Sequence, residues 1–349
     1  MRNKVSFTKR LLYIILFIIL LAGYQGYLTY RKVYTPISMQ GKSEMYYLYV
    51  HTGMSMDQLA DTLFKNKIIN DSIGFLWLAK RKNLEKHINP GRYLLNMEMN
   101  SNDLVNMIRS GKQAPVKVVF HNIRTTAQLA GLVSEQIEAD SVSITDLLND
   151  QVLLSENGWD SLSIPGLFIP NTYEFFWNTS SDEFLKRMLQ EYEIFWSGAR
   201  ESKAESVGLN KNEVSTLASI VDEETYRDDE LPKIAGVYLN RLKKRYRLQA
   251  DPTVRFAKGD FEMKRILKKD LKINSPYNTY KYYGLPPGPI SIPSIAAIDA
   301  VLNPDSNDYL YFCAREDFSG YHNFAKTLKG HNRNAIKYRS ALNRRKIYK

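Results

Sequence analysis

The sequence predicts an α+β protein with an N-terminal transmembrane helix, a small module and a larger α+β domain. Three observations support this fold class. Residues 11–22 contain no charge, residues 45–113 alternate strand and helix patterns, and the rest of the chain mixes amphipathic helices with short strands. A length of 349 residues suits two or three domains. The single cysteine excludes an internal disulfide and a four-thiolate zinc site.

The segment at residues 11–30 is predicted to cross a membrane, because as a helix it spans about 30 Å, the thickness of a hydrocarbon core. Four basic residues precede it and two follow it. This bias favours residues 1–10 in the cytoplasm and the body outside, as a single-pass protein of the cytoplasmic (inner) membrane with an extracytoplasmic or periplasmic body. A cleaved signal peptide is the alternative. It is less favoured because Leu21-Ala22-Gly23 is a poor cleavage site, and Tyr24 stands where a lipoprotein needs cysteine.

Residues 31–44 contain proline, glycine and serine and are predicted to be a linker. The module at residues 45–113 should follow the order strand, helix, helix, strand, helix. Its first strand is expected at 45–50, and Ser55 with Gln58 forms a capping box that opens the first helix. The other elements are expected at 71–81, around 91–95 and at 101–110. About seventy residues can fold independently.

The larger domain is predicted to cover residues 114–349. Its expected strands are at 116–120 and 309–314, with Cys313 in the core. Its amphipathic helices are expected at 125–138, 144–150, 181–197, 212–225 and 233–244.

The helix predicted at 212–225 carries a candidate catalytic acid. Val214, Leu217, Val221 and Glu224 follow one another at spacings of three and four, so they lie on one stripe. A carboxyl on this apolar stripe should be partly desolvated, which raises its pKa toward that of a general acid. The alternative is that the helix ends there and Glu224 is solvated. Asp222 is rotated away from the stripe.

Loops rich in aromatic and amide groups follow this helix. Residues 247–253 hold polar groups before and after Pro252, and four tyrosines lie between residues 277 and 283. Aromatic faces beside amides and hydroxyls suit a sugar-binding groove, since sugars alternate C–H patches with hydroxyls. A structural loop with packed tyrosines is the alternative.

Other chemistries find little support in the sequence. His322 and His331 are nine residues apart without a third ligand at a recognisable spacing, so no metal is predicted. Nucleotide, dinucleotide and hydrolase-elbow motifs are absent from the sequence, and no cofactor is predicted. The net charge of +11 sits at the ends: residues 1–32 carry +6 and residues 326–349 carry +9, which leaves −4 for residues 33–325. Nucleic-acid binders need a basic face on the folded body, so no nucleic-acid partner is predicted. The basic end is interpreted as a solvated helix, with contact to anionic glycan or lipid left open.

A series of short motifs resembles the endolytic murein transglycosylases, a family also described as MltG or YceG-like. Eight occur in register over about 115 residues, and Phe168-Ile-Pro-Asn-Thr-Tyr173 resembles the family's F-P-D-T-Y with Asn171 in place of Asp. The eight motifs are Ala218-Ser-Ile-Val-Asp-Glu-Glu-Thr225, Val237-Tyr-Leu-Asn-Arg-Leu242, Arg247-Leu-Gln-Ala-Asp-Pro-Thr253, Ser275-Pro-Tyr-Asn-Thr-Tyr280, Gly284-Leu-Pro-Pro-Gly-Pro-Ile290, Tyr309-Leu-Tyr-Phe312, Gly320-Tyr-His-Asn-Phe324 and His331-Asn332.

The resemblance implies a lyase that cuts peptidoglycan strands internally, between N-acetylmuramic acid and N-acetylglucosamine, and leaves 1,6-anhydro ends. It implies a LysM-like module at 45–113, a YceG-like catalytic domain at 114–349, glycan strands as substrate and peptidoglycan polymerases as partners. Its catalytic glutamate falls on Glu224. The candidate substrate-binding residues are Gln249, Asp251, Thr253, Tyr277, Asn278, Tyr280 and His322. The candidate supporting residues are Asp222, Asn240, Arg241, His331 and Asn332.

Two alternatives to this activity stay open at the level of sequence. The first is a muramidase that hydrolyses the strand with Glu224 and Asp251 as its pair of carboxylates. The second is a catalytically silent scaffold that is anchored in the membrane and binds glycan.

Overall fold

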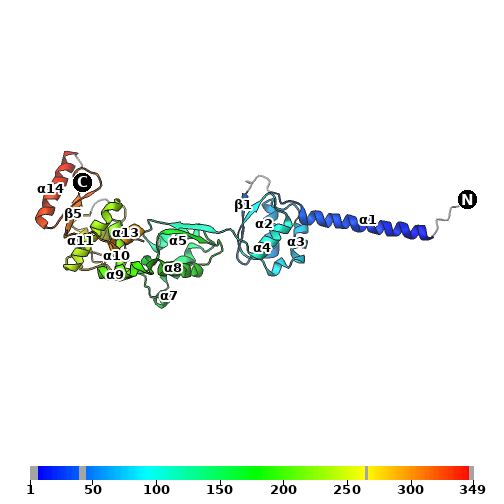
Figure 1. Ribbon diagram of the computed structural model, residues 1–349, viewed down its shortest axis with the longest axis horizontal. Helices are drawn as coiled ribbons and strands as arrows, with labels where there is room; N and C mark the ends of the chain where they lie inside the picture. Colours follow the sequence, from blue (N-terminus) through cyan, green and yellow to red (C-terminus); the bar gives the residue numbers. More distant parts are fainter. Residues whose placement is uncertain (1–6, 39–44, 264–265, 346–349) are drawn as a thin grey trace. The chain divides into compact units, whose positions relative to one another are not determined.

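The structure, a computed structural model, describes residues 7–38, 45–263 and 266–345 (Figure 1). The chain divides into two compact units, one formed by residues 1–116 with 174–179 and the other by residues 117–173 with 180–349. Each unit is described separately. In both, helices and two-stranded antiparallel sheets alternate, which agrees with the predicted mixed fold class.

Helix α1 (Phe7–Tyr34) is the apolar helix expected from the sequence. Its stretch from Lys9 to Tyr34 is long and apolar enough to cross a membrane, and none of the most apolar window is buried. The helix continues four residues into the predicted linker. The next residues are also not a free linker, because Ile37 is buried in the core of the first unit and its N–H donates to the Met99 carbonyl at 2.8 Å. The remainder of that predicted linker, residues 39–44, lies outside the described residues.

The rest of the first unit has the predicted order of strands and helices. Strand β1 (Met45–Val50) pairs antiparallel with β2 (Gly91–Asn96), so that Met45 faces Asn96 and Val50 faces Gly91. Helix α2 (Met56–Lys65) begins with the predicted Ser55–Gln58 capping box. The other elements are α3 (Ser72–Arg81), η1 (Leu84–Lys86) and α4 (Ser101–Ser110). The core lies where the helices meet the inner face of the sheet, around Leu48, Leu59, Phe75, Tyr93 and Leu104.

The second unit contains the motifs that carry the resemblance. Its helices and strands are β3 (Val116–Phe120), α5 (Thr126–Ser134), α6 (Ser141–Asn149), α7 (Gln151–Glu156), η2 (Ile164–Leu167), β4 (Asn171–Phe175), α8 (Ser181–Trp196), α9 (Ala199–Val207), α10 (Lys211–Asp222), η3 (Asp228–Glu230), α11 (Leu231–Lys243), α12 (Asp251–Lys258), η4 (Asp270–Lys272), α13 (Ile295–Leu302), β5 (Tyr311–Ala314), β6 (His322–Ala325) and α14 (Leu328–Arg344). β3 pairs with β4 and β5 with β6, and Val116 of β3 and residues 174–175 of β4 belong to the first unit.

Helix α10 is the central helix of this unit. Every residue from Val214 to Val221 is buried, including Ser215, Thr216 and Ser219. It packs against α13 and α11, so it is surrounded rather than amphipathic. The β5–β6 hairpin and α14 lie side by side at the C-terminal end of the chain (Figure 1). Strand β5 begins two residues later than predicted and is only half-buried.

Candidate active site

A cleft of about 350 Å³ in the second unit collects most of the residues singled out from the sequence. It is bounded by the turn after α10, by α11, by the start of α12, by the β5–β6 hairpin and by the first turn of α14. The residues that line it are Glu224, Tyr238, Arg241, Gln249, Asp251, Tyr280, Tyr311, Phe312, Cys313, Ala314, His322, Leu328 and His331. Cys313 is therefore a cleft residue and not, as predicted, a core residue.

Glu224 reaches this cleft from a turn and not from a helix. Helix α10 ends at Asp222, and the Glu224 N–H donates to the Val221 carbonyl at 3.2 Å in a tightened last turn. The predicted helix to residue 225 is thus too long. Because α10 is buried within the unit, the turn at its end places the half-buried Glu224 in the cleft. The apolar stripe in the sequence thus indicated a residue that is desolvated, Glu224. This residue lies in a turn, however, and not in the predicted helix.

The environment of Glu224 favours its protonated form. Burial raises the pKa of Glu224 to about 7, against a usual value of 4.5. The hydroxyl of Tyr238 donates to Glu224 Oε1 at 2.6 Å, and this bond lowers the pKa by stabilising the carboxylate. The negative charge of Asp251 raises the pKa, while Arg255 and Arg241 lower it. Desolvation is the largest of these effects, so Glu224 can hold a proton near neutral pH and release it within the cleft.

Asp251 supplies the second carboxylate of the cleft. It is the first residue of α12 and is exposed, and its Oδ1 accepts a hydrogen bond from the Tyr280 hydroxyl at 2.5 Å. The neighbouring loop is fixed by Gln249, whose φ is +49° and whose N–H donates to the Thr279 carbonyl at 3.1 Å. Two loops that are thirty residues apart in sequence are thereby joined at the cleft, and both are among the quoted motifs.

His322 enters the cleft from β6 and is held by a buried acid. Both its backbone N–H and its Nδ1 lie within hydrogen-bond distance of the Glu230 carboxylate, at 2.9 and 2.8 Å. Glu230 is only 4% exposed and immediately precedes α11. The hairpin that carries His322 is therefore tied to the start of the helix that carries Tyr238.

Arg241 and His331 also line the cleft. The buried guanidinium of Arg241 donates to the carbonyls of Leu310, at 2.6 Å, and of Leu248. The ring of His331 stacks on Tyr311 with centroids 5.5 Å apart. Burial, with the charge of Arg241, lowers the pKa of His331, so the ring is neutral near pH 7.

Two of the predicted supporting residues act away from the cleft. The carboxylate of Asp222 accepts from the Ser294 N–H and hydroxyl, both at 2.8 Å, and so joins the end of α10 to the start of α13. The Nδ2 of Asn240 donates to the carbonyls of Asn307, at 2.8 Å, and of Tyr309, at 3.1 Å. Asn240 thus fixes the segment that leads into β5.

Besides Asp222 and Asn240, the structure places four more of the predicted site residues outside the cleft. Thr253 is buried and its hydroxyl pairs with the Thr279 hydroxyl at 2.8 Å. Asn278 is also buried and donates to the carbonyls of Leu271 and Ile273. Tyr277 packs on Phe256 with ring centroids 4.5 Å apart. These three residues hold the loops that carry Gln249 and Tyr280, Thr253 and Asn278 through hydrogen bonds and Tyr277 through ring packing. Asn332 lies exposed on α14 and does not line the cleft.

Comparison with known proteins identifies the family. The model of the YceG-like family matches residues 48–337. The chain is 30% identical over 330 residues to a Bacillus subtilis (strain 168) protein named endolytic murein transglycosylase, with 90% of each chain covered. A protein of that name from Streptococcus pneumoniae (strain R6) is 28% identical over 365 residues, which cover 93% of this chain and 65% of that protein. The chain belongs to the YceG-like family.

A solved structure agrees with this assignment. The crystal structure of a YceG-like protein from Listeria monocytogenes superposes with a TM-score of 0.57 and 29% sequence identity. The match covers 83% of the present chain and 98% of that one.

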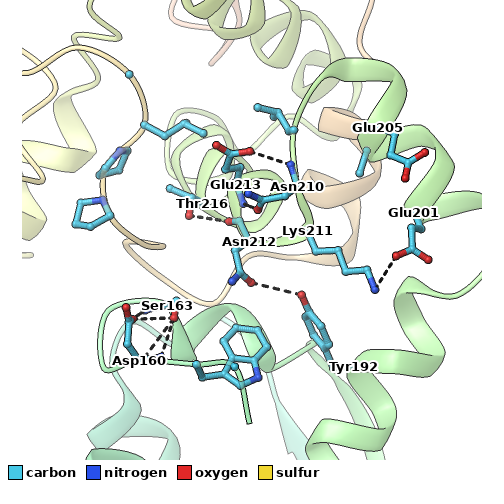
Figure 2. A pocket seen from close by; sticks show the side chains of 18 of the residues that line it. Asp160, Ser163, Tyr192, Glu201, Glu205, Asn210, Lys211, Asn212, Glu213 and Thr216 are labelled. Atoms are coloured by element: carbon cyan, nitrogen blue, oxygen red, sulfur yellow. Dashed lines mark hydrogen bonds and ion pairs between the residues drawn. The ribbon is translucent and has the colours of Figure 1, made fainter. Parts of the chain in front are cut away.

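The YceG-like chain has a second, larger hollow of about 1080 Å³ at the other end of α10, lined by residues of α8, α9 and the 284–287 loop (Figure 2). Its polar groups are largely paired with one another. Lys211 contacts Glu201 at 3.0 Å, and Asn210 and Glu213 form the capping box of α10. Figure 2 shows Lys211 reaching Glu201, and Glu213 beside Asn210. The quoted motifs contribute only the 284–287 loop and Leu242 here, so the smaller cleft is the better candidate active site.

Two residues that hold the predicted site residues Glu224 and His322 in place, Tyr238 and Glu230, were not identified as functional from the sequence. Tyr238 lies within a quoted motif, but its helical spacing assigned it to the apolar face of α11. Its side chain is indeed buried, and only its hydroxyl reaches Glu224. Glu230 lies in a short acidic run that looks solvated. The Pro232 that follows marks the start of a helix, which is the one local signal that Glu230 is held at a helix terminus.

Proposed function

We propose that this chain is an endolytic murein transglycosylase that cuts within peptidoglycan strands between N-acetylmuramic acid and N-acetylglucosamine. The observation that carries the proposal is the Glu224 carboxyl, held by Tyr238 in a cleft built from the family motifs, with its pKa raised to about 7. The names of the relatives agree with this activity.

In the proposed reaction, Glu224 first donates its proton to the glycosidic oxygen that leaves. The resulting carboxylate then takes the proton from the C6 hydroxyl of the muramic acid, whose oxygen bonds to its own anomeric carbon and closes the 1,6-anhydro ring. The proton lost by Glu224 is thus regained and no water is consumed. Because the nucleophile is part of the substrate, effective molarity replaces a second catalytic carboxylate.

The other cleft groups fit binding and positioning roles in this proposal. Tyr238 orients Glu224 and stabilises its carboxylate after proton transfer. Asp251, Gln249, Tyr280 and His322 present hydrogen-bonding groups to the sugars, and Tyr311 and Phe312 present aromatic surface. Asp251 is already bonded to Tyr280 and raises the pKa of Glu224, which makes it an electrostatic partner of the acid rather than a nucleophile.

Helix α1 is proposed to anchor the chain in the cytoplasmic membrane, with residues 1–10 inside and the body outside. The length and hydropathy of the Lys9–Tyr34 stretch and the excess of basic residues before it support this topology. The module at 45–113 is proposed to be LysM-like and to hold glycan near the enzyme. Peptidoglycan polymerases remain the proposed protein partners, as the resemblance to the family implies.

The test is digestion of purified glycan strands by the full chain in neutral detergent, made in water enriched in oxygen-18, with mass analysis of the new ends. The proposal predicts ends one water lighter than hydrolytic ends and free of the heavy isotope. Full-mass reducing ends that carry the isotope would instead establish the hydrolytic muramidase with Glu224 and Asp251 as its pair. Intact strands in every condition, with retained glycan binding, would establish a silent scaffold.

A further inference from the structure

Glu230 is a buried acid that the proposed chemistry does not use. It is 4% exposed, it does not line the cleft, and it immediately precedes α11. Its side chain makes no cap hydrogen bond with that helix, so both carboxylate oxygens are left for other partners. Both contact one residue, His322 of β6: Oε1 accepts from the backbone N–H at 2.9 Å, and Oε2 lies 2.8 Å from Nδ1.

A carboxylate is a costly group with which to tie the β5–β6 hairpin to α11. Burying an ionised group costs more free energy than burying a neutral amide of similar size. An amide, however, has a single acceptor oxygen and would meet the second nitrogen with an N–H group. An ionised carboxylate accepts on both oxygens. The contact with Glu230 therefore places the ring proton of His322 on Nδ1, in addition to holding the backbone of the hairpin.

The ring of His322 is also fixed by aromatic packing. It meets Phe312 of β5 edge-on, with ring centroids 5.4 Å apart and planes at 88°. Phe312 in turn meets the Tyr238 ring edge-on at 5.8 Å, and the hydroxyl of Tyr238 donates to Glu224. One packed series of rings thus joins His322 to the phenol that holds the candidate acid.

Nε2 is the ring nitrogen of His322 that is left for the substrate. Among the described residues it has no hydrogen-bond partner, and it is not one of the side-chain atoms that are buried without a partner. The side chain is 13% exposed and lines the cleft that contains Glu224. With the proton on Nδ1, Nε2 of the neutral ring carries a lone pair and accepts a hydrogen bond. A hydroxyl, of which a sugar has several, is the donor that such an atom suits.

We infer that Glu230 is a positioning residue, which fixes the tautomer of His322 so that Nε2 accepts a hydrogen bond from a hydroxyl of the bound glycan strand. This inference rests on the proposed function, which makes the strand the ligand of the cleft. His322 holds the hydroxyl without taking its proton, so the proton transfers of the reaction stay with Glu224. Reversing the tautomer should therefore weaken cleavage even when every side chain keeps its place, as it does where an amide replaces the carboxylate behind a catalytic histidine.

The variant Glu230→Gln tests the tautomer directly. Its amide oxygen can accept from the backbone N–H of His322, while its NH2 group donates to Nδ1 and moves the ring proton to Nε2. The full chain in neutral detergent is labelled with nitrogen-15 in its five histidines, and His322→Gln assigns the signal. The ring shifts should report a proton on Nδ1 in the wild type and on Nε2 in Glu230→Gln. On glycan strands, kcat/KM of Glu230→Gln should fall about 10- to 100-fold, with the fold retained by circular dichroism.

The variant His322→Gln separates an effect through the ring from a structural effect of Glu230. A glutamine amide can turn its oxygen toward the place of Nε2, so it accepts a hydroxyl whichever residue stands at position 230. Adding Glu230→Gln to His322→Gln should therefore change kcat/KM by less than about threefold. The matched control is Glu316→Gln, which removes the same charge beside the same hairpin, where Glu316 accepts from the Asn323 amide at 2.8 Å. It should keep the wild-type kcat/KM.

Three results would overturn the inference. The first is a wild-type ring of His322 that carries a proton on Nε2, and the second is an unchanged ring spectrum in Glu230→Gln. The third is an equal loss of kcat/KM from Glu230→Gln with and without His322, because that result assigns Glu230 a structural role only. Absence of anhydro product from the wild type would instead reject the proposed function, since the ring spectrum does not depend on cleavage.

Discussion

The two hollows at the ends of α10 differ in how their polar groups are satisfied. At the N-terminal end, the large hollow holds Lys211, Glu201 and Glu213, which are paired with neighbours. At the C-terminal end, the smaller cleft holds Glu224, a carboxyl that accepts a hydrogen bond from the Tyr238 phenol and whose pKa is raised by burial. The contrast indicates that the better candidate site is the one with a desolvated titratable group and not the one with the larger volume.

The largest expected effect is that of Glu224→Gln, which we compare with the same substitution at the other end of α10. Glu224→Gln should lower the rate of strand cleavage by about 10² to 10⁴-fold, the usual contribution of a general acid–base. Glu213→Gln should change the rate less than about twofold, because glutamine also completes a capping box. Rates on purified strands, with circular dichroism to verify folding, check both variants. Comparable losses at the two ends would break the contrast.

A smaller effect is expected from the phenols of the two hollows. Tyr238→Phe removes the hydrogen bond that stabilises the Glu224 carboxylate, so the pKa of Glu224 should rise by about one unit and kcat should fall about tenfold. Tyr192→Phe removes only a 3.4 Å contact with Asn212 and should leave the pH profile unchanged. The measurement is the pH dependence of cleavage by each variant. An unshifted profile for Tyr238→Phe would show that the phenol does not act on Glu224.

Asp222→Asn should affect stability more than activity. It replaces one of the two acceptors that hold Ser294, so the free energy of unfolding should fall by about 1–2 kcal/mol. Cleavage below the unfolding temperature should fall less than about tenfold, because Asp222 does not line the cleft. Denaturant unfolding and rate measurements on the same sample separate the two effects. A loss as large as that of Glu224→Gln, without destabilisation, would place Asp222 in the chemistry.

The smallest effect is expected in the large hollow. Lys211→Met breaks the pairs with Glu201 and Glu193, at 3.0 and 3.7 Å, but these pairs are partly exposed. The free energy of unfolding should therefore fall by less than about 1 kcal/mol. Strand cleavage should stay at the wild-type rate. A marked fall in cleavage would give the large hollow a part in substrate binding.

The sequence predicted elements well where local signals decide them. The bounds of the strands at 45–50 and 116–120 and of the helix at 101–110 agree with the structure, because alternation, caps and the glycine after α4 are local features. The helix predicted at 212–225 was too long. Because residues 214–221 are all buried, their sequence lacks the alternation of apolar and polar positions whose loss would mark the end of the helix.

The candidate site was predictable only in part, since long-range pairing decides which loop residue faces the cleft. Of the tyrosines at 277–283, Tyr280 lines the cleft, whereas Tyr277 is buried against Phe256. The difference depends on the hydrogen bonds that join Thr279 to the 249–253 loop, which no local pattern encodes. The hydroxyl of Tyr238 was missed for the same reason: its ring fits the core pattern and its partner lies fourteen residues away.

The most direct test of the central claim is the pH dependence of kcat/KM for strand cleavage by the wild-type chain. Glu224 must be protonated to donate, and its pKa is raised to about 7. Activity should therefore be full below that value and fall about tenfold per pH unit above it. Activity that stays constant to pH 9, or that already falls as the pH rises through 4.5, would contradict a desolvated Glu224 as the acid.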